Sequence, residues 1–585
     1  MPQRAVGGFP SRLLSRQSFR PVALPTRNFT ADFASSSPPR HAMKKYALSL
    51  AASLAGAACA AFLLWRTSQS RPRLPREAPP AVTTTAPAPT TPRTDPDAFS
   101  RILLTQLDRL LTRADARARE AVLTFKDDAA YRRFLERAKK SGLTILGSLD
   151  ALRSVRVRYD NLSSLRTDLL ANADDFSGVA ANSLLTIPGP PAKDDRAAIN
   201  AVPFGNRALE FLGVDPSAAT RATWGQGVTI AVLDTGIAPD RTFGDYRVRT
   251  LDIGLGTSAG TGSDDGHGTA VASVAAGAAA DAPGVAPAAG LLSIRVTDAT
   301  GASDLFTIAQ AILAATDAGA RVINISLGGY ATNATLSAAI GYAQDHGAVI
   351  VAAAGNDQAA QLSWPAADSR VISVGAVDAA EQQVTFSNSG PQLQITAPGY
   401  GVQTAWLNGQ RATVDGTSIS APLVSGAIAA VLSQNPSLTP QQAWATLQQT
   451  TDDAGAPGDD PDYGHGILNV GWAMNVNNPA RVDTAVSSHY YDAANQQMDF
   501  VVQNRSALAI TGLSLAIDAA GTGSTQLIPP LAAGATYVVK LPIDPTQLAA
   551  AGSMKFVTQL VNPTGVTDAV PANNRRSSIL TAPTK

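Results

Sequence analysis

The sequence predicts an α/β fold of three layers with a mostly parallel central sheet, preceded by a small α+β domain and followed by an antiparallel β-sandwich. Two observations predict the central domain, which we place at residues 201–480. Apolar runs such as VTIAVLD, RVINISLGG and AVIVAAAGN recur through this segment, and helical stretches such as TIAQAILAATDAG alternate with them. Runs that are apolar throughout are typical of parallel strands buried on both faces, and the helices between them cover the sheet.

The chain begins with an export or membrane element. Residues 46–65 form an apolar stretch after two lysines, and Met43 before them completes the layout of a bacterial signal peptide. We expect residues 43–66 to be a signal peptide or an uncut signal anchor. Residues 1–42 are then a mis-called start or a targeting extension. The expected location is secreted or in the cell envelope, with membrane anchoring through residues 46–65 as the alternative.

Two further segments precede the central domain. Residues 67–98 carry eight prolines among Thr, Ala and Arg, which predicts a solvated linker. In residues 99–200, AVLTF is typical of a strand, apolar residues from 131 to 138 have helical spacing, and apolar residues alternate over 155–159. The order strand, helix, hairpin, helix, strand predicts a domain of ferredoxin-like type.

The last segment, residues 481–585, has a different pattern. MDFVVQN, TGLSLAID and TYVVKLPI are short alternating segments separated by Gly, Pro and Asn turns. This pattern predicts the β-sandwich.

Composition excludes several classes of function. Lys plus Arg number 46 and Asp plus Glu number 46, so no net charge is available to bind a nucleic acid. The single cysteine, Cys59, lies in the N-terminal apolar stretch, which excludes intrachain disulfides and thiolate metal sites downstream. We expect a monomer whose function depends on a site in the central domain.

Four polar residues stand at strand ends or helix starts of the central domain. Asp234 ends VTIAVLD, Asn356 ends AAAGN, His267 opens a helix of small residues, and Ser418 enters the apolar helix of GTSISAPLVSGAIAAVL. Each alone has an ordinary structural explanation as a cap, a turn residue or a core histidine. Together they lie at one edge of one sheet, and the chain order Asp, His, Ser is one of the three convergent orders of Ser-His-Asp catalysis.

Several short motifs then resemble the subtilisin-like serine proteases, the subtilases of peptidase family S8. They are DTGI at 234–237, GHGT at 266–269, SLGG at 326–329, AAGN at 353–356 and GTSISAP at 416–422. The resemblance covers roughly residues 205–478. It implies a secreted serine endopeptidase that hydrolyses proteins and peptides through an acyl-enzyme and is made as a self-processed precursor. Residues 99–200 are similar to the family's inhibitory propeptide, and residues 481–585 resemble the β-sandwich appendages of secreted enzymes, with TDAVPANNRR as a closing strand.

The resemblance also implies roles for site residues. Asp234, His267 and Ser418 match the triad, and Asn356 matches the oxyanion donor. The expected substrate-binding residues are Ser326, Leu327 and Gly328, which match the strand that pairs with the substrate backbone, together with Ala354 and Gly355. A small uncharged lining from Leu327, Ala353, Ala354 and Ser363 favours an apolar or medium-sized residue before the cut.

No cofactor is expected for the chemistry. Many family members ligate calcium through an aspartate-bearing segment after the catalytic aspartate, and IAPDRTFGD in this chain lacks it, so a structural calcium ion stays an open question. Two alternatives to a protease remain. One is a non-enzymatic surface scaffold, against which the complete set of four residues argues. The other is an esterase on another fold, against which the residue order and the absence of G-x-S-x-G around Ser418 argue.

Overall fold

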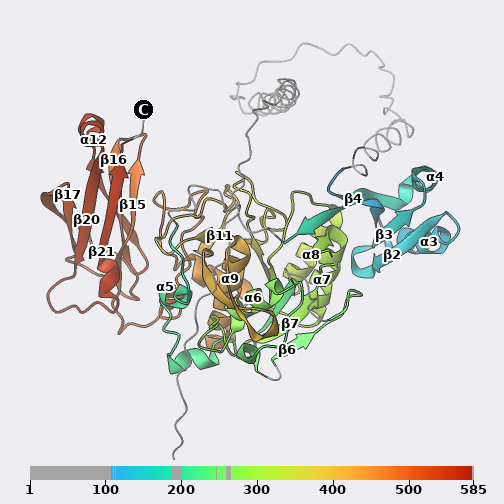
Figure 1. The fold of residues 1–585 in the computed structure, drawn as a ribbon, viewed down its shortest axis with the longest axis horizontal. Coiled ribbons are helices and arrows are strands. Elements are labelled where there is room, and N and C mark those ends of the chain that lie inside the picture. The colour runs from blue at the N-terminus through green and yellow to red at the C-terminus, as the bar shows by residue number, and fades with distance from the viewer. Residues whose placement is uncertain are drawn as a thin grey trace, which may run out of the picture. The chain divides into compact units, whose positions relative to one another are not determined.

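The computed structural model describes residues 107, 109, 111, 113–187, 201–244, 247–257, 265–298 and 300–582. The predictions for residues 1–42, 43–66 and 67–98, with Cys59 and the apolar stretch, lie outside the described residues. We call residues 113–187 the N-terminal domain, residues 201–480 the central domain and residues 481–582 the C-terminal domain (Figure 1).

The central domain is built on seven parallel strands in the order β12-β11-β10-β9-β5-β7-β6. Their bounds are β5 Thr229–Asp234, β6 Val248–Thr250, β7 Gly290–Arg295, β9 Val322–Ile325, β10 Val349–Ala353, β11 Ile372–Val377 and β12 Ile395–Pro398. Strands β5, β9, β10, β11 and β12 are buried along almost their whole length, which is why the sequence shows unbroken apolar runs.

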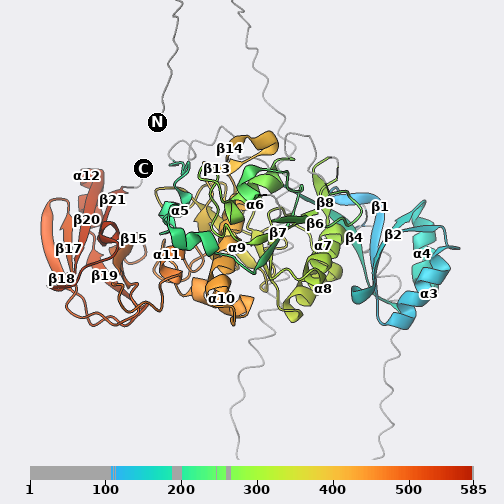
Figure 2. The same ribbon diagram turned by 90° about the horizontal axis from the view of Figure 1, so that it is seen from below.

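Helices cover both faces of this sheet. On one face lie α6 (His267–Ala276), α9 (Thr417–Gln434) and α10 (Pro440–Gln448), and on the other α7 (Leu305–Asp317) and α8 (Ala334–Asp345) (Figure 2). Successive residues of β5 alternate between the two cores: Ile230 packs with α6 and α9, and Ala231 packs with α7 and α8. The predicted three-layer α/β fold is confirmed.

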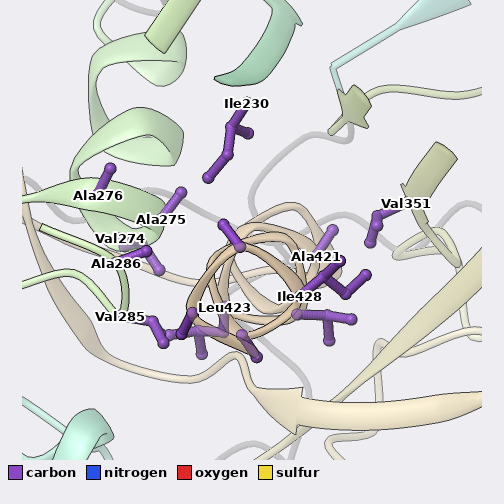
Figure 3. Packing of buried hydrophobic residues seen from close by; sticks show 14 of the residues in the cluster. Ile230, Val274, Ala275, Ala276, Val285, Ala286, Val351, Ala421, Leu423 and Ile428 are labelled. Carbon is purple, nitrogen blue, oxygen red and sulfur yellow. The ribbon is translucent and has the colours of Figure 1, made fainter. Parts of the chain in front are cut away.

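Helix α9 is the centre of one core. Figure 3 looks along it and shows Ala421, Leu423 and Ile428 among side chains of α6, the sheet and the segment after α6. A Cβ atom at Gly426 would lie 2.6 Å from the carbonyl oxygen of Ala275, so the two helices touch through backbone. Among the described residues α9 alone is long and apolar enough to cross a membrane, yet 89% of it is buried inside the protein. Its composition is that of a core helix.

Smaller elements complete the central domain. They are α5 (Ala208–Phe211), α11 (Val470–Ala473), the strand β8 (Ala302–Asp304) and the hairpin β13 (Val402–Ala405) with β14 (Arg411–Val414).

The N-terminal domain has the topology that its sequence predicts. Its elements are β1 Ala116–Phe125, α3 Asp128–Ala138, β2 Leu143–Leu149, β3 Ser154–Tyr159, α4 Leu162–Ala171 and β4 Phe176–Thr186. The strands form an antiparallel sheet in the order β2-β3-β1-β4, and β8 of the central domain adds to the edge at β4. Phe134 of α3 packs against Phe125 of β1 and Phe176 of β4.

The C-terminal domain has two antiparallel sheets around one core. Strands β15 (Thr484–Asp492), β16 (Gln497–Asn504) and β19 (Thr536–Pro542) form one sheet, and β17 (Ser514–Ala519), β18 (Thr522–Leu527), β20 (Ser553–Val561) and β21 (Arg575–Thr581) form the other, with α12 (Pro545–Ala551) beside them. The closing strand begins only at Arg575, because Pro571–Asn574 form a short 3-10 turn where TDAVPANNRR was expected to be extended.

Candidate active site

The carboxyl ends of three adjacent strands bring the predicted residues to one edge of the sheet. Strands β10, β9 and β5 are neighbours. Asp234 is the last residue of β5, Ser326 follows β9, and Asn356 comes three residues after β10. Helices α6 and α9 begin at His267 and Thr417, so Ser418 is the second residue of its helix. This edge is where ligands bind in parallel α/β sheets.

A chain of hydrogen bonds joins three of the predicted residues. The Nδ1 atom of His267 lies 2.9 and 3.0 Å from the two carboxylate oxygens of Asp234, and its Nε2 lies 3.0 Å from the hydroxyl of Ser418. Because a carboxylate only accepts hydrogen bonds, Nδ1 carries the proton and Nε2 is free to accept from the serine. The exposed fractions are 0% for Asp234, 5% for His267 and 2% for Ser418, so the contacts are shielded from solvent.

Local sequence fixes His267 over Asp234. The hydroxyl of Thr235 accepts from the backbone N–H of Gly268 at 3.0 Å and donates to the carbonyl of Asp265 at 2.9 Å. A Cβ atom at Gly268 would lie 2.4 Å from the carbonyl oxygen of Gly236. Only glycine allows the first turn of α6 to approach the strand end this closely.

Asn356 is held from the side of α9. Its Oδ1 accepts from the backbone N–H of Thr417 at 3.0 Å and from the Thr417 hydroxyl at 2.8 Å. Its Nδ2 is buried and makes no hydrogen bond within the described residues. A Cβ atom at Gly416, whose φ is 139°, would lie 2.8 Å from Nδ2 and 3.0 Å from the Ser418 hydroxyl. The unpaired N–H donor of Asn356 therefore lies close to the Ser418 hydroxyl. Gly416 lies between the two groups, and a side chain there would collide with both.

Thr417 is a site residue that sequence reasoning missed. Thr417 lies between Gly416 and Ser418 of the GTSISAP motif. The sequence does not distinguish a threonine that holds the Asn356 amide from any threonine in the first turn of a helix.

The predicted substrate-binding segment divides into a buried part and an accessible backbone. The hydroxyl of Ser326 donates to the carbonyl of Ser418 at 2.8 Å and lies behind the site rather than in it. Leu327 belongs to the core under α7 and α8. The backbone of Gly328 exchanges two hydrogen bonds of 3.0 Å with Thr186 of the N-terminal domain. Of the three residues, Gly328 thus makes the strand contact.

The remaining predicted residues form a lining of small groups. The Ser363 hydroxyl lies 3.2 Å from the carbonyls of both Ala353 and Ala354, and a Cβ atom at Gly328 would meet it at 2.6 Å. Gly355 has a φ of 111°, a conformation that favours glycine.

An extended segment of the N-terminal domain crosses this edge. Leu184, Leu185 and Thr186 of β4 pair antiparallel with β8, while Thr186 also pairs with Gly328 on its other side. Next to this strand, the guanidinium of Arg117 lies 2.6 Å from Asp304 and 2.8 Å from Asp298. Strand β4 is therefore inserted between two edges of the central domain.

The other described histidines have structural partners. His346 stacks on Tyr342 and His465 pairs with Asp459. His489 lies in β15, and burial, with a smaller effect of Arg576, lowers its pKa to about 3. Within the described residues no three His, Cys, Asp or Glu side chains gather as metal ligands.

Known proteins resemble this chain over the central domain. Residues 225–466 match the sequence profile of peptidase S8, the Subtilase family. Subtilisin Savinase of Lederbergia lenta is 36% identical over 272 residues, which cover 46% of this chain and 97% of that protein. The thermostable alkaline protease of Halalkalibacterium halodurans is 34% identical over 274 residues, which cover 46% of this chain and 73% of that protein. A solved mutant of the protease domain of PatA matches with a TM-score of 0.41 and 28% identity, over 44% of this chain and 96% of that one.

Proposed function

This chain belongs to the subtilase family of serine endopeptidases, and from that premise we propose that Ser418 is its nucleophile, activated by His267 and Asp234. The observation that carries the proposal is the place of His267, whose two ring nitrogens lie within 3.0 Å of the carboxylate and of the hydroxyl. A serine becomes an activated nucleophile when its hydroxyl is hydrogen-bonded to a base that a third group orients.

The chemical steps follow from these contacts. Nε2 of His267 takes the hydroxyl proton while Ser418 Oγ bonds to the scissile carbonyl carbon, and the same proton passes to the leaving amine as the C–N bond breaks. Water then hydrolyses the acyl-enzyme by the same route. Asp234 holds the histidine tautomer and stabilises the imidazolium.

Asn356 is the proposed side-chain donor to the oxyanion, together with the backbone N–H of Ser418. Its Oδ1 is engaged by Thr417 while its buried Nδ2 has no partner within the described residues, so the amide is oriented before substrate binds. Asn356→Ala should lower kcat by about 10² to 10³, which is the magnitude established for loss of the oxyanion-hole asparagine in subtilisin, a member of this same family.

The proposed substrate is an extended segment of a protein or peptide that adds a strand beside Gly328, with Ala354 and Gly355 shaping the site and Leu327 supporting it from the core. The pairing of Thr186 with both Ala302 and Gly328 supports this, because it shows that one extended strand fits between these edges. The small groups at Ala353, Ala354 and Ser363 favour an apolar or medium-sized residue before the cut.

The precursor organisation is the second part of the proposal. Residues 99–200 act as an inhibitory propeptide whose strand β4 blocks the substrate edge until Ser418 cuts the chain. Residues 43–66 direct export to the cell envelope or beyond, as a cleaved signal or an anchor, after a linker at 67–98. The mature form is a monomer of residues 201–480, to which residues 481–585 stay attached as a β-sandwich.

The test compares two purified proteins by mass, the wild type exported by its own route and a Ser418→Ala form made alongside. We expect the wild type to lose roughly its first 180 to 205 residues and the Ser418→Ala form to keep its propeptide. If both forms keep these residues, self-processing is wrong. If the wild type also hydrolyses no peptide after another protease removes them, the role of Ser418 is wrong as well.

A further inference from the structure

Asn356 lies in a loop, residues 354–359, that is fastened to a second segment far along the chain. Asn388 in that segment is fully buried. Its backbone N–H donates to the carbonyl of Gly355 at 3.0 Å, and the backbone N–H of Ser389 donates to the carbonyl of Ala359 at 3.0 Å. Residues 388–389 therefore lie alongside the loop and fix the path of its backbone.

The side chain of Asn388 uses all of its hydrogen-bonding capacity here. Oδ1 accepts from the backbone N–H groups of Asp357 and Ala359, both at 3.0 Å. Nδ2 donates to the carbonyl of Ala354 at 3.2 Å and to the hydroxyl of Tyr330 at 2.9 Å. The orientation of the amide is fixed, since a flipped amide would set N–H against N–H.

These bonds reach both sides of Asn356. They engage Ala354 and Gly355 before it and Asp357 and Ala359 after it. A Cβ atom at Gly355 would lie 2.2 Å from Nδ2 of Asn388, so the amide is in direct contact with the backbone next to Asn356. Four anchored neighbours leave the Asn356 backbone little freedom to move.

We propose that Asn388 is a positioning residue for the reaction, which sets the backbone of Asn356 so that Nδ2 meets the oxyanion. The inference rests on the donor role proposed for Asn356. Thr417 orients the Asn356 side chain from α9, and Asn388 fixes the main chain on both sides of Asn356. An oxyanion donor acts through its exact distance to the developing charge, so loss of this support reduces transition-state stabilisation.

Tyr330 extends the same support toward the surface. Its hydroxyl accepts from Asn388 and donates to the carboxylate of Asp357 at 2.5 Å. Burial and the hydrogen bond to Asp357 raise the pKa of Tyr330 to about 12, so the hydroxyl keeps its proton at neutral and mildly alkaline pH. Because Tyr330 is 43% exposed, it can be changed with little risk to folding.

The first test is the Asn388→Asp variant, which keeps the size and the acceptor but replaces the donor with an oxygen facing the Ala354 carbonyl. We expect kcat to fall about 10-fold to 100-fold with KM within about 2-fold, per active site titrated with a serine-directed reagent. The matched control is Asn504→Asp. Asn504 is equally buried and clamps a loop of the C-terminal domain through the carbonyls of Leu508, Leu531 and Ala532. That variant should lose stability and keep its kcat.

A double-mutant cycle separates positioning from general damage. In an Asn356→Ala background, Asn388→Asp should lower kcat by less than about 2-fold, because no donor remains to be positioned. If Asn388→Asp costs the same factor in both backgrounds, the inference is overturned. If Asn356→Ala alone leaves kcat unchanged, the donor role under the proposed function is what fails.

Tyr330→Phe removes the hydroxyl that supports Asn388 and Asp357, and it provides a second test if the Asn388 variants do not fold. It should lower kcat about 2-fold to 5-fold in the wild type and leave it unchanged in the Asn356→Ala background. A loss in both backgrounds, or in neither, would contradict the role of this support.

Discussion

The central domain contacts its two neighbours through Arg–Asp pairs of different kinds. Arg117 of the N-terminal domain forms ion pairs with Asp298 and Asp304 of the central domain and is 24% exposed. At the C-terminal domain, Arg505 pairs with Asp452 at 2.9 Å, is only 6% exposed, and lies over the ring of Trp472 at 5.8 Å. In the first contact solvent reaches Arg117 and Asp298 while Asp304 is buried, and the contact accompanies a strand placed where substrate is expected. The second is closed over by an aromatic ring.

Of the two contacts, the N-terminal one is suited to release. Partly exposed ion pairs each contribute little free energy, whereas a buried arginine is costly to leave without its carboxylate. We expect the N-terminal domain to leave after cleavage and the C-terminal domain to stay.

The largest expected effect is at the C-terminal contact. Arg505→Met should lower the free energy of unfolding by about 2 kcal/mol, because Asp452 loses its cation and keeps only the amide of Asn469, 2.7 Å away. The cost is no larger because Asp452 is 26% exposed and water can solvate its charge. Urea unfolding of the Ser418→Ala protein measures it. Arg576→Met, which removes a more exposed pair with Glu381, serves as the control and should cost less than about 1 kcal/mol. Equal costs would mean that burial of the arginine does not distinguish the two pairs.

The next effect concerns release of the N-terminal domain. Arg117→Gln removes a pair with the partly exposed Asp298 and a pair with the buried Asp304, which keeps Arg156 at 3.3 Å. The two pairs are worth together about 1 to 1.5 kcal/mol, so the lag before activity arises from purified precursor should shorten about 10-fold. Arg113→Gln is the control, because Arg113 pairs with Asp115 inside its own domain. A lag that is unchanged in Arg117→Gln would mean that these pairs do not hold the domain.

The smallest effect is a pH dependence of the same contact. Burial raises the pKa of Asp298, but hydrogen bonds from Thr300 and Arg117 outweigh it and lower the pKa to about 2. A lowered carboxyl pKa stabilises the contact above about pH 4, and this contribution is lost as pH falls toward 2. Only the lowering of the Asp298 pKa that is due to Arg117 stabilises the contact between the domains. The lowering due to Thr300 remains after the N-terminal domain is released, because Thr300 belongs to the central domain.

Hydrogen exchange on the Ser418→Ala precursor tests this dependence. The protection factors of the Gly328 and Phe306 amides, which donate to Thr186 and Asn182 of the N-terminal domain, should fall a few-fold between pH 5 and pH 3. In Asp298→Asn the fall should be smaller. The same fall in both proteins would assign the pH dependence to other groups.

The fold was predictable where the sequence pattern is local. Apolar runs identify β5, β9 and β10 because a strand buried on both faces needs no polar residue, and the carboxyl edge then follows from the parallel arrangement. The strand β8 was not predicted. It has only three residues, and its partner β4 lies more than a hundred positions earlier in the chain.

The site was predictable down to its motifs but not to its contacts. The motifs place Asp234, His267 and Ser418 at one edge, yet whether a serine side chain points into the site or behind it depends on packing, and Ser326 points behind it. Asn388 carried no signal, since FSNSG resembles any turn and its hydrogen-bond partners lie some 30 residues away.

The most direct test of the activated serine is covalent labelling of the mature protein with a fluorophosphonate, which bonds to a serine oxygen only where a neighbouring base takes the proton. Peptide mapping should find one adduct, on Ser418. The His267→Ala variant, from which another protease has removed residues 99–200, should lose the adduct while keeping its fold by circular dichroism. An adduct on a different serine, or equal labelling of Ser418 without His267, would contradict the proposed triad.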